Sequence, residues 1–142
     1  MTLHRVVFDT STLVSAALRA ESIPRQALQQ ALRYCEVCAS KETLDELSAV
    51  LARAKFRSYA PDMVRQEFVR IMQTQARLFV VRDWAALGVA PACRDPFDDK
   101  VLALAFEAEA DAIVSSDEDL LVLHPWNEIQ IVRPGDFLKQ VG

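Results

Sequence analysis

Short apolar runs alternate with longer amphipathic segments along this chain, and the alternation predicts strands that alternate with helices. The runs have the length and aliphatic character of buried strands, and they lie at residues 6–8, 35–39, 78–81, 111–115 and 129–132. Between them, apolar residues recur every three or four positions, as on the buried face of a helix. The positions expected to face a core are Leu13, Ala16, Ala17, Ala27, Leu28, Ala31, Leu32, Leu44, Leu47, Val50, Leu51, Val64, Phe68, Ile71, Met72, Val101, Leu102, Ala105 and Phe106.

Residues that favour a first helical turn mark where these helices begin. Pro24 suits a first turn, Ser40 can cap the helix after the second strand, and Asp99 opens a helix after a polar loop at 91–96. Helices between successive strands are the crossover connections that parallel strands need. The expected fold class is therefore α/β: a three-layer α/β/α sandwich with a mainly parallel central sheet of about five strands, formed by residues 1–142 as a single domain.

Composition narrows the class of protein. With 142 residues and 51% hydrophobic content, the chain suits one core without a linker. It has no apolar run of membrane-spanning length, and it begins without the features of a secretory signal. Its three cysteines form no even disulfide framework. A cytoplasmic location is therefore expected.

The cysteines and histidines carry no predicted chemistry. Cys35 and Cys38 have the spacing of a metal-binding pair, but residues three apart in a strand point to opposite faces of the sheet. No second pair completes a zinc site, and His4 and His124 are single and far apart. Both cysteines are expected in the core, where free cysteine is common.

Acidic residues follow two of the predicted strands. Asp9 comes directly after the first strand and Asp117 comes just after the strand at 111–115. Both are therefore expected at the edge of the sheet where open α/β folds bind ligands. Asp99 would join them if its helix begins beside that edge.

A fourth candidate comes from the helix after the second strand. On a helical wheel Glu46 borders the apolar arc beside Val50, whereas Asp45 and Glu42 point further from the core. Of these three acids, Glu46 is the one best placed to lean over the sheet edge.

Four converging carboxylates favour a metal site. Such a cluster is unfavourable unless a cation occupies it, because each negative charge raises the pKa of its neighbours. Mg²⁺ and Mn²⁺ prefer oxygen ligands and can activate water against a phosphodiester. Each acid also has a structural alternative, since Asp9 and Asp117 can cap helices, Asp99 can complement a helix N-terminus and Glu46 can be solvated.

The net charge of −4 at first argues against a nucleic-acid partner. However, 20 acidic residues less the four candidates leave 16, which equals the 16 lysines and arginines. The rest of the chain is therefore neutral, and a local basic patch can hold RNA. Arg53, Lys55 and Arg57 are candidates for phosphate contacts, or alternatively form a solvated helix end.

These segments together resemble the PIN-domain family, and within it the single-domain, VapC-like toxins of toxin–antitoxin systems. The resemblance covers nearly the whole chain, and its last two motifs are the more specific. The motifs are Val6-Val7-Phe8-Asp9-Thr10-Ser11, Thr43-Leu44-Asp45-Glu46-Leu47, Asp95-Pro96-Phe97-Asp98-Asp99-Lys100 and Ser115-Ser116-Asp117-Glu118-Asp119-Leu120.

The resemblance implies a ribonuclease that hydrolyses RNA with Mg²⁺ or Mn²⁺, forms a homodimer and is inhibited by a cognate antitoxin protein. It assigns catalysis and metal binding to Asp9, Glu46, Asp99 and Asp117. Ser11 would orient Asp9 or a metal-bound water; many relatives have asparagine there, and a hydroxyl can also donate to a carboxylate. Asp98 competes with Asp99 for the third position, and Asp119 would add an outer contact.

Two other functions fit parts of the pattern. A haloacid-dehalogenase-like phosphatase also has a nucleophilic aspartate after its first strand, but it needs a second acid two residues later, where this chain has Ser11. A non-catalytic PIN-like module that binds RNA or a partner also fits the fold, although four intact acids speak against it.

Overall fold

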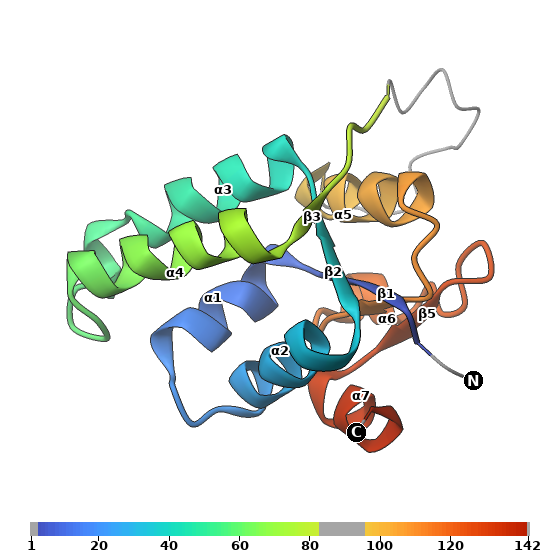
Figure 1. Ribbon diagram of the computed structural model, residues 1–142, viewed down its shortest axis with the longest axis horizontal. Coiled ribbons are helices and arrows are strands. Elements are labelled where there is room, and N and C mark those ends of the chain that lie inside the picture. Colours follow the sequence, from blue (N-terminus) through green and yellow to red (C-terminus); the bar gives the residue numbers. More distant parts are fainter. Residues whose placement is uncertain (1–2, 83–95, 142) are drawn as a thin grey trace.

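The five predicted strands form one sheet, with helices on both of its faces (Figure 1). The computed structural model describes residues 3–82 and 96–141, and it describes residues 96–99 by their backbone alone. The strands are β1 (Arg5–Phe8), β2 (Glu36–Ala39), β3 (Arg77–Leu78), β4 (Ala112–Val114) and β5 (Gln130–Val132). The helices are α1 (Thr10–Leu18), α2 (Ile23–Tyr34), α3 (Lys41–Leu51), α4 (Asp62–Gln75), α5 (Pro96–Glu107), α6 (Glu118–Leu121) and α7 (Pro134–Gln140), with a 3-10 turn η1 (Ala54–Phe56).

The strand order brings the ends of β1 and β4 together. All described strand pairs are parallel, and the order is β3-β2-β1-β4-β5. The chain moves outward from β1 to β3 on one side and then continues with β4 on the other side of β1. A crevice forms where the order reverses in this way, beyond the carboxyl ends of the strands. Phe8 pairs with Val114 at that edge.

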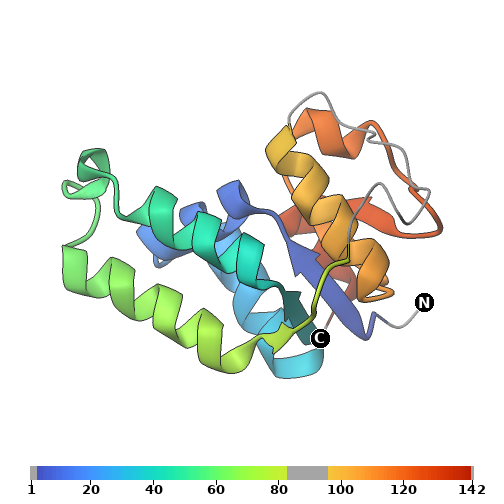
Figure 2. The same ribbon diagram turned by 90° about the horizontal axis from the view of Figure 1, so that it is seen from above.

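Alternating side chains of the strands build two cores, one on each face of the sheet. Val6 and Phe8 of β1 belong to a core with α1, α2, α3, α4 and α7. Val7 points the other way, into a second core with α5, α6 and Ile113 of β4. Figure 2 shows β1 between α1 and α5. The predicted three-layer α/β/α fold with a parallel sheet is confirmed.

Local capping fixes where the helices begin. Ser40 Oγ accepts the backbone N–H of Thr43 at 3.1 Å, and Thr43 Oγ1 accepts that of Ser40 at 3.0 Å, which makes a reciprocal capping box. Ser22 caps α2, which has Pro24 in its first turn. The helix predicted to open at Asp99 begins earlier, at Pro96, because proline is suited to the first turn.

The buried positions of α4 are shifted by about one residue along the sequence from the predicted ones. The apolar pattern placed Val64 and Phe68 on that face. The structure buries Arg65, Val69 and Met72 instead, Phe68 is only partly buried, and half of the surface of Val64 is exposed. Because a charged side chain lies at the centre of the buried face, a prediction from apolar spacing could not find it.

Arg65 joins the end of α3 to the start of α4. Its guanidinium donates hydrogen bonds to the carbonyls of Leu51, Arg53 and Ala60, and it pairs with Asp62. Arg65→Met is expected to lower the free energy of unfolding by about 2 kcal/mol, because it leaves buried carbonyls without a donor. Urea unfolding measures this change. Arg70→Met, at an exposed position of the same helix, is the matched control and should change stability by about 0.5 kcal/mol or less. Equal stability of the two variants would contradict the role of Arg65.

Two elements near the ends of the sheet differ from the prediction. The strand expected at 78–81 is observed as β3, Arg77–Leu78. Helix α7 was not predicted, because seven residues are too few to establish a helical period. Its signal was Pro134, its first residue, and it packs through Phe137, which is fully buried.

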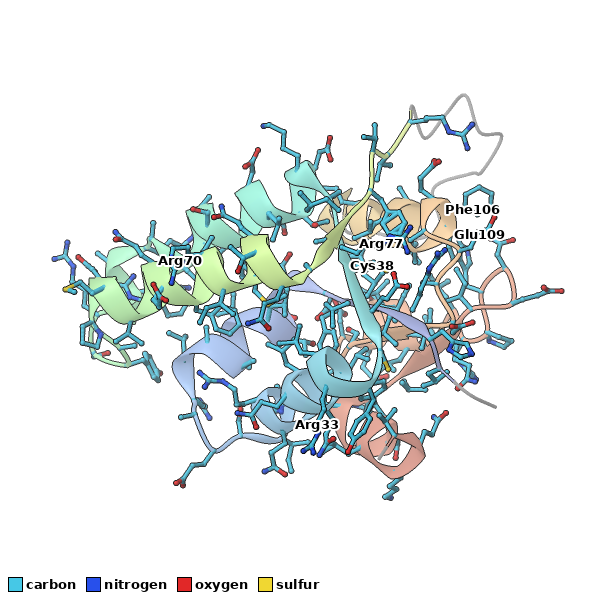
Figure 3. The ribbon with its side chains drawn as sticks, viewed as in Figure 1. Arg33, Cys38, Arg70, Arg77, Phe106 and Glu109 are labelled. Carbon is cyan, nitrogen blue, oxygen red and sulfur yellow. The ribbon has the colours of Figure 1, made fainter. Side chains whose placement is uncertain are left out.

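Cys35 and Cys38 pack on opposite sides of the sheet, as predicted. Cys35 contacts the core of α1 and α2, whereas Cys38 belongs to the core of α5. Figure 3 shows Cys38 beside Arg77, its partner on β3. Burial raises the pKa of the Cys38 thiol to about 11, so this group stays protonated at neutral pH. Among the helices described above, none is both long and apolar enough to span a bilayer.

Candidate active site

An open cleft of about 960 Å³ lies at the carboxyl edge of the sheet. Three of the four predicted acids line it: Asp9 after β1, Glu46 on α3 and Asp117 after β4. The crossing of the chain at this edge thus brings together carboxylates that are far apart in the sequence. The rest of the lining consists of Thr10, Ser11, Val14, Ser15, Glu42, Asp45, Ala49, Val50, Arg53, Phe56, Lys100 and Val101.

Asp9 is held on all sides, with 2% of its surface exposed. One carboxylate oxygen accepts the backbone N–H of Thr12 at 2.9 Å and thereby caps α1. The other accepts the hydroxyls of Ser115 and, at 3.4 Å, of Ser11. Capping a helix and lining the cleft were alternative roles in the sequence. The structure shows that Asp9 does both.

Burial raises the pKa of the Asp9 carboxyl above its ordinary value. Hydrogen bonds from Ser115 and Thr12 act in the opposite direction, and the nearby charge of Asp117 adds to the rise. A positive charge in the cleft would favour the ionised carboxylate. The electrostatics of Asp9 therefore suit a cation.

Ser115 is a site residue that the sequence pattern did not reveal. It is fully buried, its hydroxyl donates to Asp9, and it accepts the backbone N–H of Asp117 at 2.9 Å. Ser115 thus joins two acids that follow different strands. The signal was a serine directly after the apolar run of β4, but a hydroxyl at a strand end has many structural explanations.

Of two adjacent acids on α3, Glu46 is the one that leans over the cleft. Its side chain is only 13% exposed, and its carboxylate lies 3.6 Å from Nζ of Lys100 on α5. The side chain of Asp45 is 64% exposed and pairs with Lys41, one turn earlier on the same helix. Both residues border the cleft, but Glu46 alone of the two forms an ion pair across it.

Asp117 also combines a cap with a place in the cleft. Its carboxylate accepts the backbone N–H of Asp119 at 2.9 Å and caps α6. Asp119 is half-buried in the first turn of that helix. Its backbone N–H holds the Asp117 side chain in place through this hydrogen bond.

Asp98 and Asp99 lie in the first turn of α5, and their side chains are outside the described residues. That turn adjoins the cleft, since Lys100 and Val101 line it. Among the described side chains, no three Asp, Glu, His or Cys residues approach one another closely enough to hold an ion. The donor chemistry of the cleft, carboxylates with hydroxyls, nevertheless fits a hard divalent cation.

The predicted basic residues lie beside the cleft, after α3. Arg53 lines it, whereas Lys55 and Arg57 are exposed on the adjoining η1 turn and its end. Lys100, which had no predicted role, brings a further positive charge to the acidic side of the cleft.

Among known proteins, one family profile matches this chain, and several solved structures have a similar fold. The profile of the family described as PIN domain matches residues 5–119, and no curated protein matches the sequence. The structure of VapBC2 from Rickettsia felis, bound to a DNA fragment from their promoter, gives a TM-score of 0.61 at 12% identity, covering 89% of this chain and 96% of that one.

Two further solved structures share the architecture. VapC20 from Mycobacterium tuberculosis, described as a sarcin–ricin loop cleaving toxin, gives a TM-score of 0.58 at 16% identity over 88% of this chain and 98% of that one. FitAcB from Neisseria gonorrhoeae gives 0.54 at 15% identity, over 92% and 98%. At these identities the likeness concerns the fold.

Proposed function

Because the chain belongs to the PIN-domain family, we propose that it is a divalent-metal-dependent endoribonuclease that hydrolyses RNA phosphodiester bonds. The observation that carries the proposal is the cleft lined together by Asp9, Glu46 and Asp117. Asp99 is the fourth metal ligand, with Asp98 as its competitor for that position. RNA is the substrate class because cationic side chains border this acidic cleft.

Mg²⁺ or Mn²⁺ bound by these acids would supply a water of lowered pKa and offset the charge of the phosphate. The chain's own residues hold the acids in place. Ser115 and Ser11 donate to the same oxygen of Asp9, so that its carboxylate cannot rotate away. Asp117 is fixed by its cap on α6, with Asp119 as an outer contact. Lys100 restrains Glu46 from the opposite wall.

The protein acts in this proposal as the toxin of a type II toxin–antitoxin pair. The fold it shares with VapC20, described as a cleaving toxin, and with VapBC2 supports this role. The partner is a cognate antitoxin that covers the cleft and places a charged side chain at the carboxylates. A homodimer in the cytoplasm completes the proposal.

The second candidate is a PIN-like module that binds RNA or a partner without cleaving it. The observation in its favour is that Arg53 and Lys100 line the cleft, where their charges attract an RNA backbone whether or not it is cleaved. One experiment separates the two functions. Purified protein is incubated with total RNA and Mg²⁺ or Mn²⁺, with and without excess EDTA, and the RNA ends are mapped. New ends at defined positions, absent in EDTA, support the nuclease. RNA that is retained by the protein but remains intact under every condition supports the binding module.

Ser115→Ala is expected to lower the cleavage rate by about 10- to 100-fold, the usual effect of removing a group that orients a metal ligand. The reason is that the carboxylate oxygen Oδ2 of Asp9 loses one of the two hydroxyls that donate to it. Initial rates at saturating metal measure the change. Ser116→Ala removes the neighbouring, exposed hydroxyl and should leave the rate unchanged. Equal activity of the two variants would contradict a positioning role for Ser115.

A further inference from the structure

A strip of basic and aromatic side chains continues from the cleft along the connection between α3 and α4. From residue 51 to residue 61 the sequence contains three basic residues, two aromatic residues and no acidic residue. Arg19, at the end of α1, adds a fourth cation beside them, because its guanidinium lies 5.9 Å from the ring centre of Tyr59. The basic–aromatic strip consists of Arg19, Arg53, Lys55, Phe56, Arg57 and Tyr59.

Among the side chains that the structure describes, the cations of the basic–aromatic strip have no acidic partner. Across residues 3–82 and 100–141, Asp and Glu carboxylates lie within 4.0 Å of many arginines and lysines, but of none of the four in the strip. Arg70, labelled in Figure 3, shows the usual arrangement, since it pairs with Glu67. A chain with net charge −4 therefore keeps unneutralised positive charge at this end, which attracts a polyanion.

The Tyr59 ring of the strip is exposed, and the Phe56 ring beside it is partly buried. Tyr59 is 55% exposed, and its ring centre lies 6.4 Å from that of Phe56, with the two planes inclined by 63°. Lys55 Nζ lies 5.1 Å from the Phe56 ring centre. Exposed rings among cations are the usual platform for unpaired bases, which stack on the rings while their phosphates meet the charges.

The strip leads into the cleft and is held by the fold. Arg53 and Phe56 belong to the lining of the cleft. The connection between α3 and α4, at the left end of these two helices in Figure 1, continues from them to Tyr59. Arg65 binds the carbonyls of Leu51, Arg53 and Ala60, so both ends of this connection are fixed before any ligand arrives.

We propose that the basic–aromatic strip binds a single-stranded stretch of RNA whose neighbouring phosphodiester lies in the cleft. This inference rests on the proposed function, because it takes the cleft as the place of cleavage. Bases lie on Tyr59 and Phe56, and phosphates contact Arg19, Arg53, Lys55 and Arg57. The inclination of the two rings selects a single strand, since bases lying on both rings are unstacked from each other, as a regular duplex does not allow.

The test measures RNA binding without cleavage. A fluorescent single-stranded RNA of mixed sequence is titrated with full-length protein in EDTA at several salt concentrations. Tyr59→Ala is expected to weaken binding about tenfold and Tyr59→Phe to retain it, because stacking needs the ring. Lys55→Gln with Arg57→Gln should lower the slope of log affinity against log salt by roughly 0.7 for each phosphate that the variant no longer neutralises. Arg70→Gln with Lys139→Gln removes two exposed cations elsewhere and should leave both quantities unchanged.

Three results would overturn the inference. The first is wild-type affinity in both Tyr59→Ala and the Lys55/Arg57 double variant. The second is equally tight binding of a duplex of the same sequence that depends on the same residues. The third is displacement of the RNA by polyglutamate of equal charge, which would assign the strip to an acidic protein segment. Binding is measured in EDTA and is therefore independent of cleavage. If the protein binds RNA through the strip but never cleaves it, only the proposed nuclease function is refuted. If the protein cleaves RNA with metal but the strip variants bind RNA as wild type does, only the proposed role of the strip is refuted.

Discussion

Asp9→Asn is expected to lower the rate of RNA cleavage by roughly a thousandfold, because it removes one negative ligand from the proposed metal site, which would supply several kcal/mol of transition-state stabilisation. The same substitution should make the metal-free protein more stable at neutral pH by about 1 kcal/mol. The two effects have one origin. In the proposed metal site a cation would offset the charge of the buried Asp9 carboxylate, and without the cation that buried charge is unfavourable.

The gain in stability depends on pH in a defined direction. Burial raises the pKa of Asp9 in the folded chain above its unfolded value of about 3.9. The native state therefore binds the proton more tightly. The contribution of this carboxyl to stability is fully present below the unfolded pKa and is lost as the pH rises through the folded pKa. The stability difference between Asp9→Asn and wild type should therefore be small at acidic pH and grow toward neutral pH.

Asparagine fits the site well enough for this comparison. Its side-chain oxygen can accept the N–H of Thr12, since asparagine is a strong helix cap, and its amide can donate to the Ser115 hydroxyl. Urea unfolding in EDTA across this pH range measures the difference. Asp117→Asn is the control, because that carboxylate is only half-buried and should gain less. Added Mg²⁺ should stabilise wild type more than Asp9→Asn. A metal-free Asp9→Asn protein that is less stable than wild type at neutral pH would contradict this account.

Glu46→Gln is expected to lower the cleavage rate by roughly a hundredfold, whereas Asp45→Asn should leave it within about twofold of wild type. The two substitutions remove the same charge from neighbouring positions of α3. They differ in where the carboxylate lies: that of Glu46 faces Lys100 across the cleft, and that of Asp45 pairs with Lys41 on the helix surface. Initial rates at saturating Mg²⁺ measure both.

Comparing Glu46→Gln with Asp45→Asn also tests which acid is the metal ligand, provided that both variants fold as wild type does. Circular dichroism and urea unfolding should be similar for the two variants, because neither side chain is in a core. An active Glu46→Gln protein together with an inactive Asp45→Asn protein would show that the wrong acid had been assigned. Loss of activity in both would point to the charge of the whole helix face.

The fold could be predicted because its elements have strong local signals. Apolar runs marked β1, β2, β4 and β5, and Ser40 marked the start of α3 through its capping box. The meeting of Asp9 and Asp117 at one edge followed from a general property of parallel sheets, in which carboxyl ends lie together. Glu46 followed from helical geometry, since a residue beside a buried arc must lean toward the same wall.

Other parts depend on contacts between segments that no local pattern encodes. The burial of Arg65 is favourable only because carbonyls from the end of α3 and the loop before α4 surround it. Ser115 acquires its place in the site through Asp9, which follows the adjacent strand β1. Lys100 becomes part of the cleft because α5 crosses the sheet opposite α3. Each of these residues has an ordinary local environment in the sequence and an unusual one in three dimensions.

The hydrogen bond between Ser115 and Asp9 joins residues 106 positions apart, across the adjacent strands β1 and β4. A chain still being made on the ribosome carries Asp9 early, but β4 and the hydroxyl beyond it emerge only when most of the domain has been translated. Contacts between such distant segments carry a cost in loop-closure entropy and slow the folding of the chain. Chains that end before β4 therefore lack the central pairing of β1 with β4 and the Asp117 side of the cleft.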